Sequence, residues 1–258
     1  WKSRGLGDVY KRQSTMGRSF WILDNITPLR TYGNFSQASL LKINDTHRYR
    51  YRSYSDEHLS YPPSAVDFDY FISKENVEKV TISIYGDDDN LINSYSSRLE
   101  QEEVDEYEMS SSTFVSLKSN KISTGKGLNR FSWDMRHRGS WDENVNRSFR
   151  SGPMVSPGEY VILLDIDGVK SSKSFKILED PRVEGMSGDD YLEQEKFLLN
   201  VRDFLTDLKV FKSDLDEKMK SSSSGIYDEI YNLLVTSKGT YMQPMLIDQT
   251  RYLQSMLG

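Results

Sequence analysis

The sequence predicts an α+β protein that begins with short β-strands and ends with amphipathic helices. Three observations lead to this prediction. Between residues 61 and 183, apolar and polar side chains alternate over short runs, which is the period of half-buried strands. Asp167 and Gly168 separate two of these runs, as in a two-residue hairpin turn. After Ser187 the apolar spacing lengthens to that of a helix face.

Residues 1–13 are set apart from the rest of the chain. The run from Ser3 to Gln13 reads as an in-frame translation of an adapter used in preparing sequencing libraries, so we interpret residues 1–13 as an artefact without a packed role. They carry a net charge of +3, from four basic residues and one acidic residue, while the whole chain carries −6. The remainder therefore carries −9. An acidic chain repels phosphate, which argues against a nucleic-acid partner.

The composition excludes several other classes of protein. Cysteine is absent, which rules out a disulfide framework and any cysteine-ligated zinc site. No apolar run reaches the length of a membrane span, and no basic face is offered to an anionic membrane. The length of 258 residues suits one or two domains with a proper core.

The first predicted strand is the apolar run from Phe20 to Leu23, which turn residues end at Pro28. It has no neighbour in the sequence with which to pair, so we expect its partners to lie upstream of the chain. Residues 31–60 are polar and rich in turn residues, apart from a short apolar strand at Leu40 to Ile43. They are predicted to form a linker.

Residues 61–183 are predicted to form a β-sandwich, because at least five short strands alternate with turn signals. A turn at residues 86–90 and the turn at Asp167 and Gly168 each predict a hairpin. The acidic stretch at residues 99–112 interrupts the pattern and is expected to be a solvated insertion. The strands are expected around residues 66–72, 80–84, 91–95, 128–133, 160–164 and 169–177.

The C-terminal residues predict helices. Ser187 and Asp190 have the spacing of a capping box, and a wide apolar stripe follows on one long helix to about Lys220. Shorter helices are expected after a flexible break at residues 221–225 and after Pro244. We expect these helices to pack on each other as a hairpin or to lie against a sheet. The stripe is interpreted as core, and it includes Phe197, Phe204 and Phe211 at intervals of seven residues.

Several segments resemble one family. The segment from Gly17 to Arg30 is similar to the one that closes the β-propeller in large secreted bacterial proteins with sortilin-like, sialidase-type (BNR) repeats, commonly labelled glycosyl hydrolases. The segment from Gly127 to Arg136 resembles part of the immunoglobulin-like domain that follows the propeller. Weaker likenesses occur at Pro62–Pro63, Val66–Tyr70, Gly152–Pro153, Pro157–Tyr160 and Asp180–Arg182, and in the helices.

The resemblance implies a division of the chain. Residues 14–30 would be the last strand of a truncated propeller, 31–60 a linker, 61–183 an immunoglobulin-like β-sandwich, and 184–258 a truncated helical region. It implies a secreted, periplasmic or cell-surface protein whose partners are the missing upstream propeller and a glycan or protein ligand. Because the propeller is nearly absent from the chain, no catalytic residue of the family can be carried onto a position here.

The residues themselves offer no complete chemical site. Three histidines, at 47, 58 and 137, lack metal-ligand spacing, and His137 is interpreted as a solvated strand end. Asp67 and Asp69 share one strand face, which we interpret as the wet face of a sheet rather than a glycosidase pair. Trp133 is expected to be core, with Asp134 at the strand end. Residues 87–90 are interpreted as a polar turn rather than a calcium loop, and residues 125–127 lack the features of a phosphate loop. Accordingly we assign no catalytic, cofactor-binding or metal-binding residue.

The expected function is that of a non-catalytic, structural accessory module of a secreted protein. Two alternatives stay open. The intact protein could be a glycosyl hydrolase whose acids lie in the missing propeller, or the chain could bind a carbohydrate or protein through exposed aromatic side chains.

Overall fold

The computed structural model describes most of the chain from residue 39 onward and two short segments before it. The described residues are 11–14, 20–23, 26, 30, 39–50, 64–86, 89–98, 122–143, 151–221, 225–239 and 242–257, with backbone only for 11–14, 20–23 and 151. The predictions for the acidic stretch at 99–112, for His58, and for Asp87 and Asp88 therefore lie outside the described residues.

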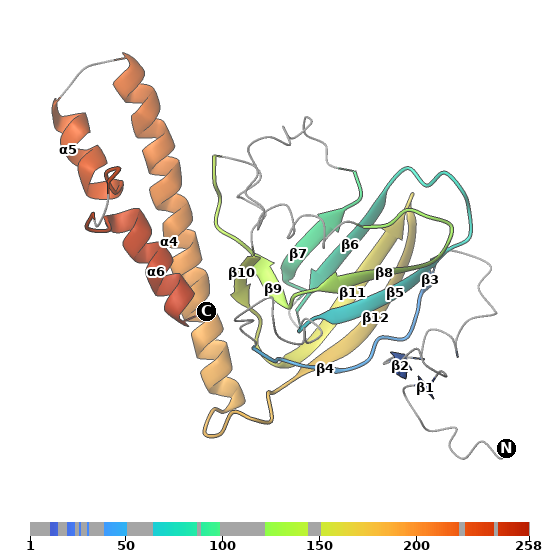
Figure 1. The fold of residues 1–258 in the computed structure, drawn as a ribbon. Helices are drawn as coiled ribbons and strands as arrows, with labels where there is room; N and C mark the ends of the chain where they lie inside the picture. Colours follow the sequence, from blue (N-terminus) through green and yellow to red (C-terminus); the bar gives the residue numbers. More distant parts are fainter. Residues whose placement is uncertain are drawn as a thin grey trace.

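The predicted α+β class is confirmed, because β-sheets come first and α-helices follow (Figure 1). We call residues 39–178 the β-region and residues 188–257 the helical region. The strands of the β-region are β3 (Ser39–Leu40), β4 (Thr46–His47), β5 (Val66–Ile72), β6 (Val80–Tyr85), β7 (Leu91–Ser96), β8 (Gly127–Trp133), β9 (Arg136–Arg138), β10 (Ser151–Met154), β11 (Gly158–Ile166) and β12 (Val169–Leu178).

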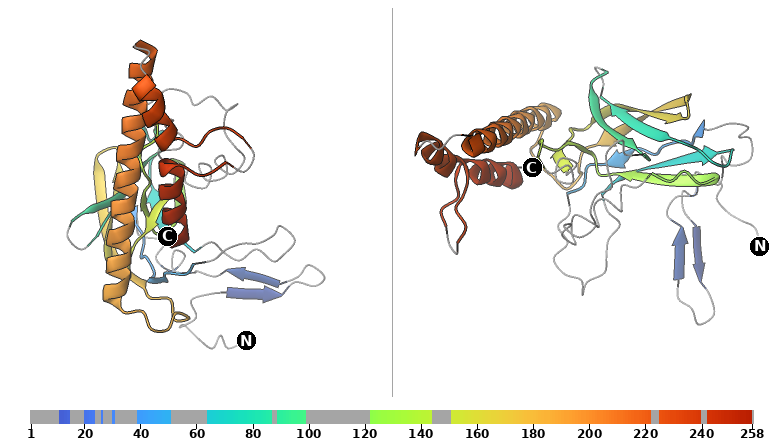
Figure 2. Two further views of the ribbon diagram at one scale, coloured as in Figure 1. Left: turned by 90° about the vertical axis from the view of Figure 1, so that its left-hand side faces the viewer. Right: turned by 90° about the horizontal axis from the view of Figure 1, so that it is seen from above.

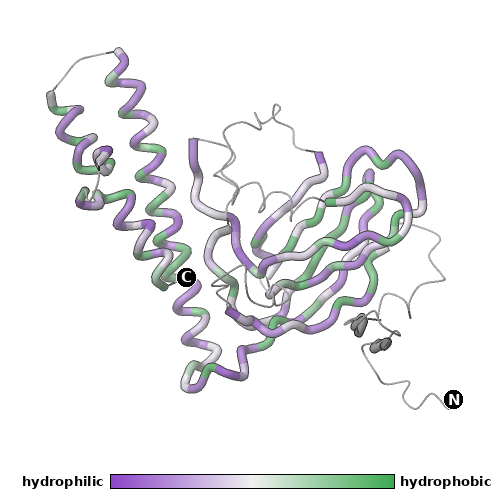
Figure 3. Tube along the Cα trace, in the orientation of Figure 1, coloured by the Kyte–Doolittle hydropathy of each residue, from purple (hydrophilic) through white to green (hydrophobic). Residues whose placement is uncertain are grey.

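Two larger sheets and one small one make up the β-region. The larger sheets have the strand orders β4-β12-β11-β6-β7 and β3-β5-β8, and the small sheet pairs β10 with β9. Both predicted hairpins are present, β6 with β7 and β11 with β12. The second turns at Asp167 and Gly168, whose positive φ angles of 48° and 89° are those of a type I′ turn. Figure 3 shows hydrophobic and hydrophilic residues alternating along the strands.

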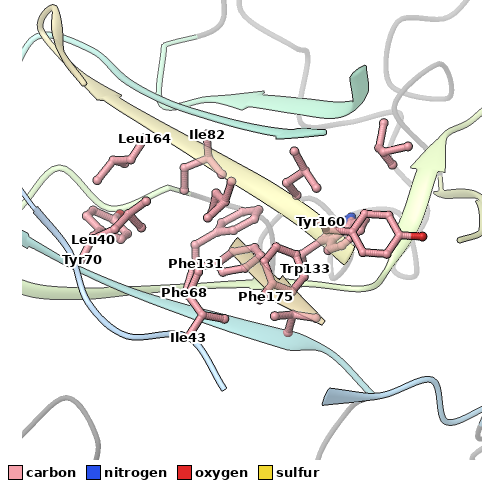
Figure 4. Close-up of a cluster of buried hydrophobic side chains, with 14 of the residues drawn as sticks. Leu40, Ile43, Phe68, Tyr70, Ile82, Phe131, Trp133, Tyr160, Leu164 and Phe175 are labelled. Atoms are coloured by element: carbon pink, nitrogen blue, oxygen red, sulfur yellow. The ribbon is translucent and has the colours of Figure 1, made fainter. Parts of the chain in front are cut away.

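One apolar core joins the two larger sheets (Figure 4). Trp133 is fully buried there, as the sequence predicts. Its ring meets Tyr160 and Phe175 edge-on, with centroids 6.1 and 6.3 Å apart, a preferred arrangement of aromatic pairs. Met135 is also buried, but it follows the end of β8 and has a left-handed φ of 57°.

The N-terminal segments differ from expectation. Strand β2 (Phe20–Leu23) has a partner within the chain, because it pairs antiparallel with β1 (Lys11–Ser14). The expectation that this strand lacks a neighbour is therefore wrong, and Lys11, Arg12 and Gln13 supply backbone to the pair. The β1–β2 hairpin stands outside the larger sheets (Figures 1 and 2).

Residues 39–47 do more than connect. Leu40 of β3 pairs with Tyr70 of β5, and β4 runs parallel to the end of β12. The side chains of Leu40, Leu41 and Ile43 are buried, so this part of the predicted linker belongs to the sheets and their core. A run of apolar residues this short does not predict a long strand, but it is long enough to pair with the edge of a sheet and to bury its side chains there.

The helical region consists of α4 (Gly188–Ser221), α5 (Gly225–Leu234) and α6 (Leu246–Leu257). The capping box is confirmed, since the Asp190 amide donates to Ser187 Oγ over 3.3 Å and the Ser187 amide donates to the Asp190 carboxylate over 2.7 Å. Both expected packing modes occur, with α5 and α6 on α4 and α4 on β10. None of the described helices is both long enough and apolar enough to cross a membrane.

The predicted core stripe of α4 is only partly buried. Its packed side is formed by Tyr191, Leu198, Val201, Leu205, Leu208 and Leu215. The three phenylalanines at positions 197, 204 and 211 are each 48% exposed, so their assignment to the core is wrong. The physical reason is that α5 and α6 cover one side of α4, and a stripe as wide as the predicted one extends past that side.

Candidate functional site

The junction between the β-region and the helical region brings together polar groups from separate parts of the chain. His137 on β9 and Glu195 on α4 meet with 2.5 Å between Nε2 and Oε1. The other oxygen of Glu195 accepts the backbone N–H of Ser156 over 2.7 Å. His137 is only 4% exposed, so the interpretation of this histidine as a solvated strand end is wrong. Glu195, the partner of this buried histidine, lies 58 residues away in the sequence.

A cation and an aromatic ring surround this cluster. Arg48, which follows β4, donates from Nε to the carbonyl of Val155 over 2.7 Å. Its guanidinium lies 5.0 Å from the centroid of the Tyr191 ring at the start of α4, within the range of a cation–π contact. Three segments distant in sequence, at residues 48, 155 and 191, therefore join at one point.

The electrostatics keep Glu195 ionised. Burial alone would raise the pKa of its carboxyl, but the hydrogen bonds from His137 and Ser156 outweigh burial, and the net effect is a lowered pKa. An ionised carboxylate can only accept, so His137 donates from Nε2. For Arg48, desolvation by burial is the largest influence and lowers the pKa of the guanidinium.

The three residue types at the junction occur together in nucleophilic hydrolases, but their geometry does not fit that chemistry. A serine nucleophile needs its hydroxyl next to the base and open to substrate. Ser156 is 1% exposed, so its hydroxyl is closed to substrate. Its backbone N–H donates to Glu195. The cluster therefore fits a structural clamp that joins helix to sheet.

A cleft of about 530 Å³ opens further along α4, between the loop at residues 141–143 and the helices. Trp141 is 38% exposed at the cleft. Lys209 on α4 reaches the Asp142 carboxylate at 3.0 Å and the Ser140 hydroxyl at 3.0 Å. The cleft is lined by Trp141, Asp142, Glu143, Lys209, Lys212, Val235, Thr236, Ile247, Asp248 and Arg251.

The charged side chains of the cleft largely neutralise one another. On α6, Arg251 pairs with Asp248 at 3.0 Å, and the other oxygen of Asp248 accepts the Thr236 hydroxyl over 2.6 Å. On α4, Lys212 pairs with Asp216 at 2.5 Å. An aromatic ring beside paired polar groups can contact the apolar face and the hydroxyls of a polar ligand.

The acidic residues weighed from the sequence lie elsewhere. Asp69 is 5% exposed and accepts two hydrogen bonds from Arg130, at 2.8 and 3.0 Å. Asp67 accepts the Ser132 hydroxyl over 2.6 Å and lies 3.4 Å from Arg130. The interpretation as a wet strand face is therefore wrong for Asp69, because a partner from the neighbouring strand β8 neutralises it.

The remaining candidates are dispersed. His47 Nδ1 lies 2.7 Å from the carbonyl oxygen of Glu179, so this histidine does not take part in the clamp. Among the described residues, no group of three or more His, Asp or Glu side chains is placed to hold a metal ion. Sequence reasoning missed Glu195 and Trp141 altogether. The sequence offered one signal for Glu195: it is a charged residue on the same helix face as the buried Tyr191 and Leu198, and a charged residue in such a position usually has a partner.

Comparison with known proteins adds no relative. A scan against models of protein families finds no match, and a search of curated proteins finds none either.

Proposed function

We propose that this chain is a non-catalytic accessory module of a secreted protein, in which the β-region is an immunoglobulin-like sandwich and the helical region is an interaction arm. The upstream part of that protein, by the resemblance of residues 17–30, would be a β-propeller. The observation that carries the proposal is the clamp of His137, Glu195 and Ser156, because it fixes a 34-residue helix to a sheet without leaving a reactive group open.

The strand order supports the immunoglobulin-like assignment. Strands β12-β11-β6-β7 opposite β3-β5-β8 have the order expected for strands G-F-C-C′ opposite A-B-E of such a domain. Tyr160, near the start of β11, donates its hydroxyl to the carbonyl of Ser156 over 2.6 Å. A tyrosine that bonds to backbone just upstream of strand F is a hallmark of these domains. The buried tryptophan departs from the antibody pattern, because it lies on β8 and no cysteine pair accompanies it.

The non-catalytic part rests on how the carboxylates are used. Glycoside hydrolysis needs one acid and one base held across a sugar, about 5–9 Å apart. Asp69 is neutralised by Arg130, Asp142 by Lys209 and Asp248 by Arg251. Each of these three carboxylates is therefore engaged by a cation within the chain rather than by a second acid across an open site.

The test is an assay of the purified chain on a broad panel of aryl glycosides. We expect no turnover above buffer. Turnover that Asp142→Asn or Asp248→Asn abolishes would overturn the non-catalytic assignment. Turnover that appears only in a longer chain carrying the upstream sequence would support the alternative that the whole protein is a glycosyl hydrolase.

A second candidate function is the binding of a glycan in the cleft. The specific observation in its favour is the exposed ring of Trp141 beside paired polar groups. Titration of the chain with oligosaccharides, followed by tryptophan fluorescence, would then give a saturable change that Trp141→Ala removes. A flat titration at millimolar oligosaccharide would exclude this function.

A further inference from the structure

The phenylalanines of α4 form one apolar face together with leucines of α6. The exposed residues Phe197, Phe204 and Phe211 recur every seven positions, so they lie in a line about 21 Å long on a helix that rises 1.5 Å per residue. On α6 the leucines at positions 246, 253 and 257 are exposed, as are Tyr252 and Met256. The Phe–Leu face consists of Phe197, Phe204, Phe211, Leu246, Leu253 and Leu257.

Both rows lie on the same side of the helix pair, opposite the cleft. Phe211 comes two residues after the cleft residue Lys209, and Leu253 comes two residues after the cleft residue Arg251. Two residues are about 200° of helix rotation, and Phe211 is also about 100° from the cleft residue Lys212, so both side chains are turned away from the cleft. The two helices are antiparallel neighbours, because Gln194 near the start of α4 donates to the carbonyl of Leu257 at the end of α6.

Acidic side chains lie beside the row of phenylalanines on α4. Glu193, Asp207 and Asp214 lie three or four residues from a phenylalanine of the row, which places them beside it on the same helix surface. All three are exposed. Lys196 and Lys218 are the basic residues towards the two ends of the row, so its middle is acidic.

We propose that the Phe–Leu face binds an amphipathic helix of a partner protein whose apolar seam is flanked by lysine or arginine. Helices pair in this way when apolar residues repeat every seven positions and opposite charges meet beside the seam. The charge pattern argues against a second copy of this chain, because a copy would bring Asp207 and Asp214 towards like charges. This inference rests on the proposed role of the helical region as an interaction arm and names its class of partner.

The probe is a labelled synthetic peptide of three heptads with leucine at the seam positions and lysine beside them. Two comparison peptides carry glutamate in place of lysine, or the same residues in scrambled order. Binding to the full chain is followed by fluorescence anisotropy. We expect the lysine peptide to bind at least about tenfold more tightly than either comparison peptide, because both the seam and the charges must match.

Three variants of the chain sharpen the result. Phe204→Ser should weaken binding of the lysine peptide by at least about tenfold, as for a central interface residue. The double charge reversal Asp207→Lys with Asp214→Lys should switch the preference to the glutamate peptide. Leu192→Ser is the matched control, because Leu192 is exposed on α4 but lies about 100–140° of helix rotation away from the three phenylalanines. This variant should bind the lysine peptide as tightly as the parent does.

Other results of the binding and sedimentation experiments overturn the proposal. Equal binding of all three peptides, or binding unaffected by Phe204→Ser, would show that the face is not the site. A dimer in sedimentation that Phe204→Ser converts to monomer would identify a second copy as the occupant. Turnover in the glycosidase assay would refute the proposed function alone, since it does not involve the Phe–Leu face.

Discussion

Replacing Glu195 by alanine should release the helical region from the β-region. The change removes the acceptor of two buried donors, the His137 ring N–H at 2.5 Å and the Ser156 backbone N–H at 2.7 Å. A buried donor left without a partner costs about 1–3 kcal/mol, so the two together should lower the free energy of unfolding by about 2–6 kcal/mol. Glu195→Gln keeps one carbonyl acceptor, so its free energy of unfolding should lie between those of Glu195→Ala and the parent.

The measurement is urea denaturation followed by far-ultraviolet circular dichroism and by tryptophan fluorescence. Circular dichroism follows the helices, and the fluorescence of the buried Trp133 reports on the β-region core. In the parent the two signals should change together. In Glu195→Ala the helical signal should change first, because the clamp no longer couples the two regions.

The matched control is Glu193→Ala. Glu193 lies on the same turn of α4 and is exposed, so its replacement should change the free energy of unfolding by less than about 0.5 kcal/mol. If Glu195→Ala costs no more than this control, the hydrogen bonds at the junction do not hold the two regions together, and the clamp reasoning is refuted.

Three further predictions concern the β-region and the clamp. Trp133→Ala should cost about 3–5 kcal/mol of unfolding free energy in urea, and parent-like stability would mean that the ring is not a core anchor. Gly152→Ala should lower the melting temperature, because its Cβ would lie 2.5 Å from the Arg138 carbonyl, whereas Gly125→Ala, with its nearest neighbour at 3.6 Å, should not. The pKa of Glu195 is lowered in the folded state, so its stabilisation is complete above the ordinary value of 4.5 and is lost as pH falls through the folded-state pKa. Urea titrations of Glu195→Gln should accordingly show a flatter loss of stability below pH 4.5 than the parent.

Local signals predicted most of the elements. The hairpin at Asp167 and Gly168 followed from residue types that accept positive φ, and the start of α4 from the spacing of Ser187 and Asp190. Trp133 could be assigned to the core because β-strand alternation alone places it there. Each of these depends on residues within a few positions of one another.

The junction and the Phe–Leu face could not be predicted in this way. His137 is buried by Glu195 and Asp69 is neutralised by Arg130, and both partners come from strands or helices far along the chain. The width of the apolar stripe on α4 could be read from the sequence, but which part of it α5 and α6 cover could not. That choice depends on the path of the chain after Ser221.

The parallel pairing of β4 with the end of β12 has a consequence for synthesis of the protein. The Lys176 backbone N–H donates to the Asp45 carboxylate across 131 residues of sequence, so this edge of the sheet has a very long contact span. At about 5–20 residues per second, a ribosome needs roughly 7–26 s to make the intervening chain. During that interval Thr46 and His47 of β4 have no partner strand, although Leu40 can already pair with Tyr70 of β5. Completion of this edge therefore has to wait until nearly the whole β-region has been made.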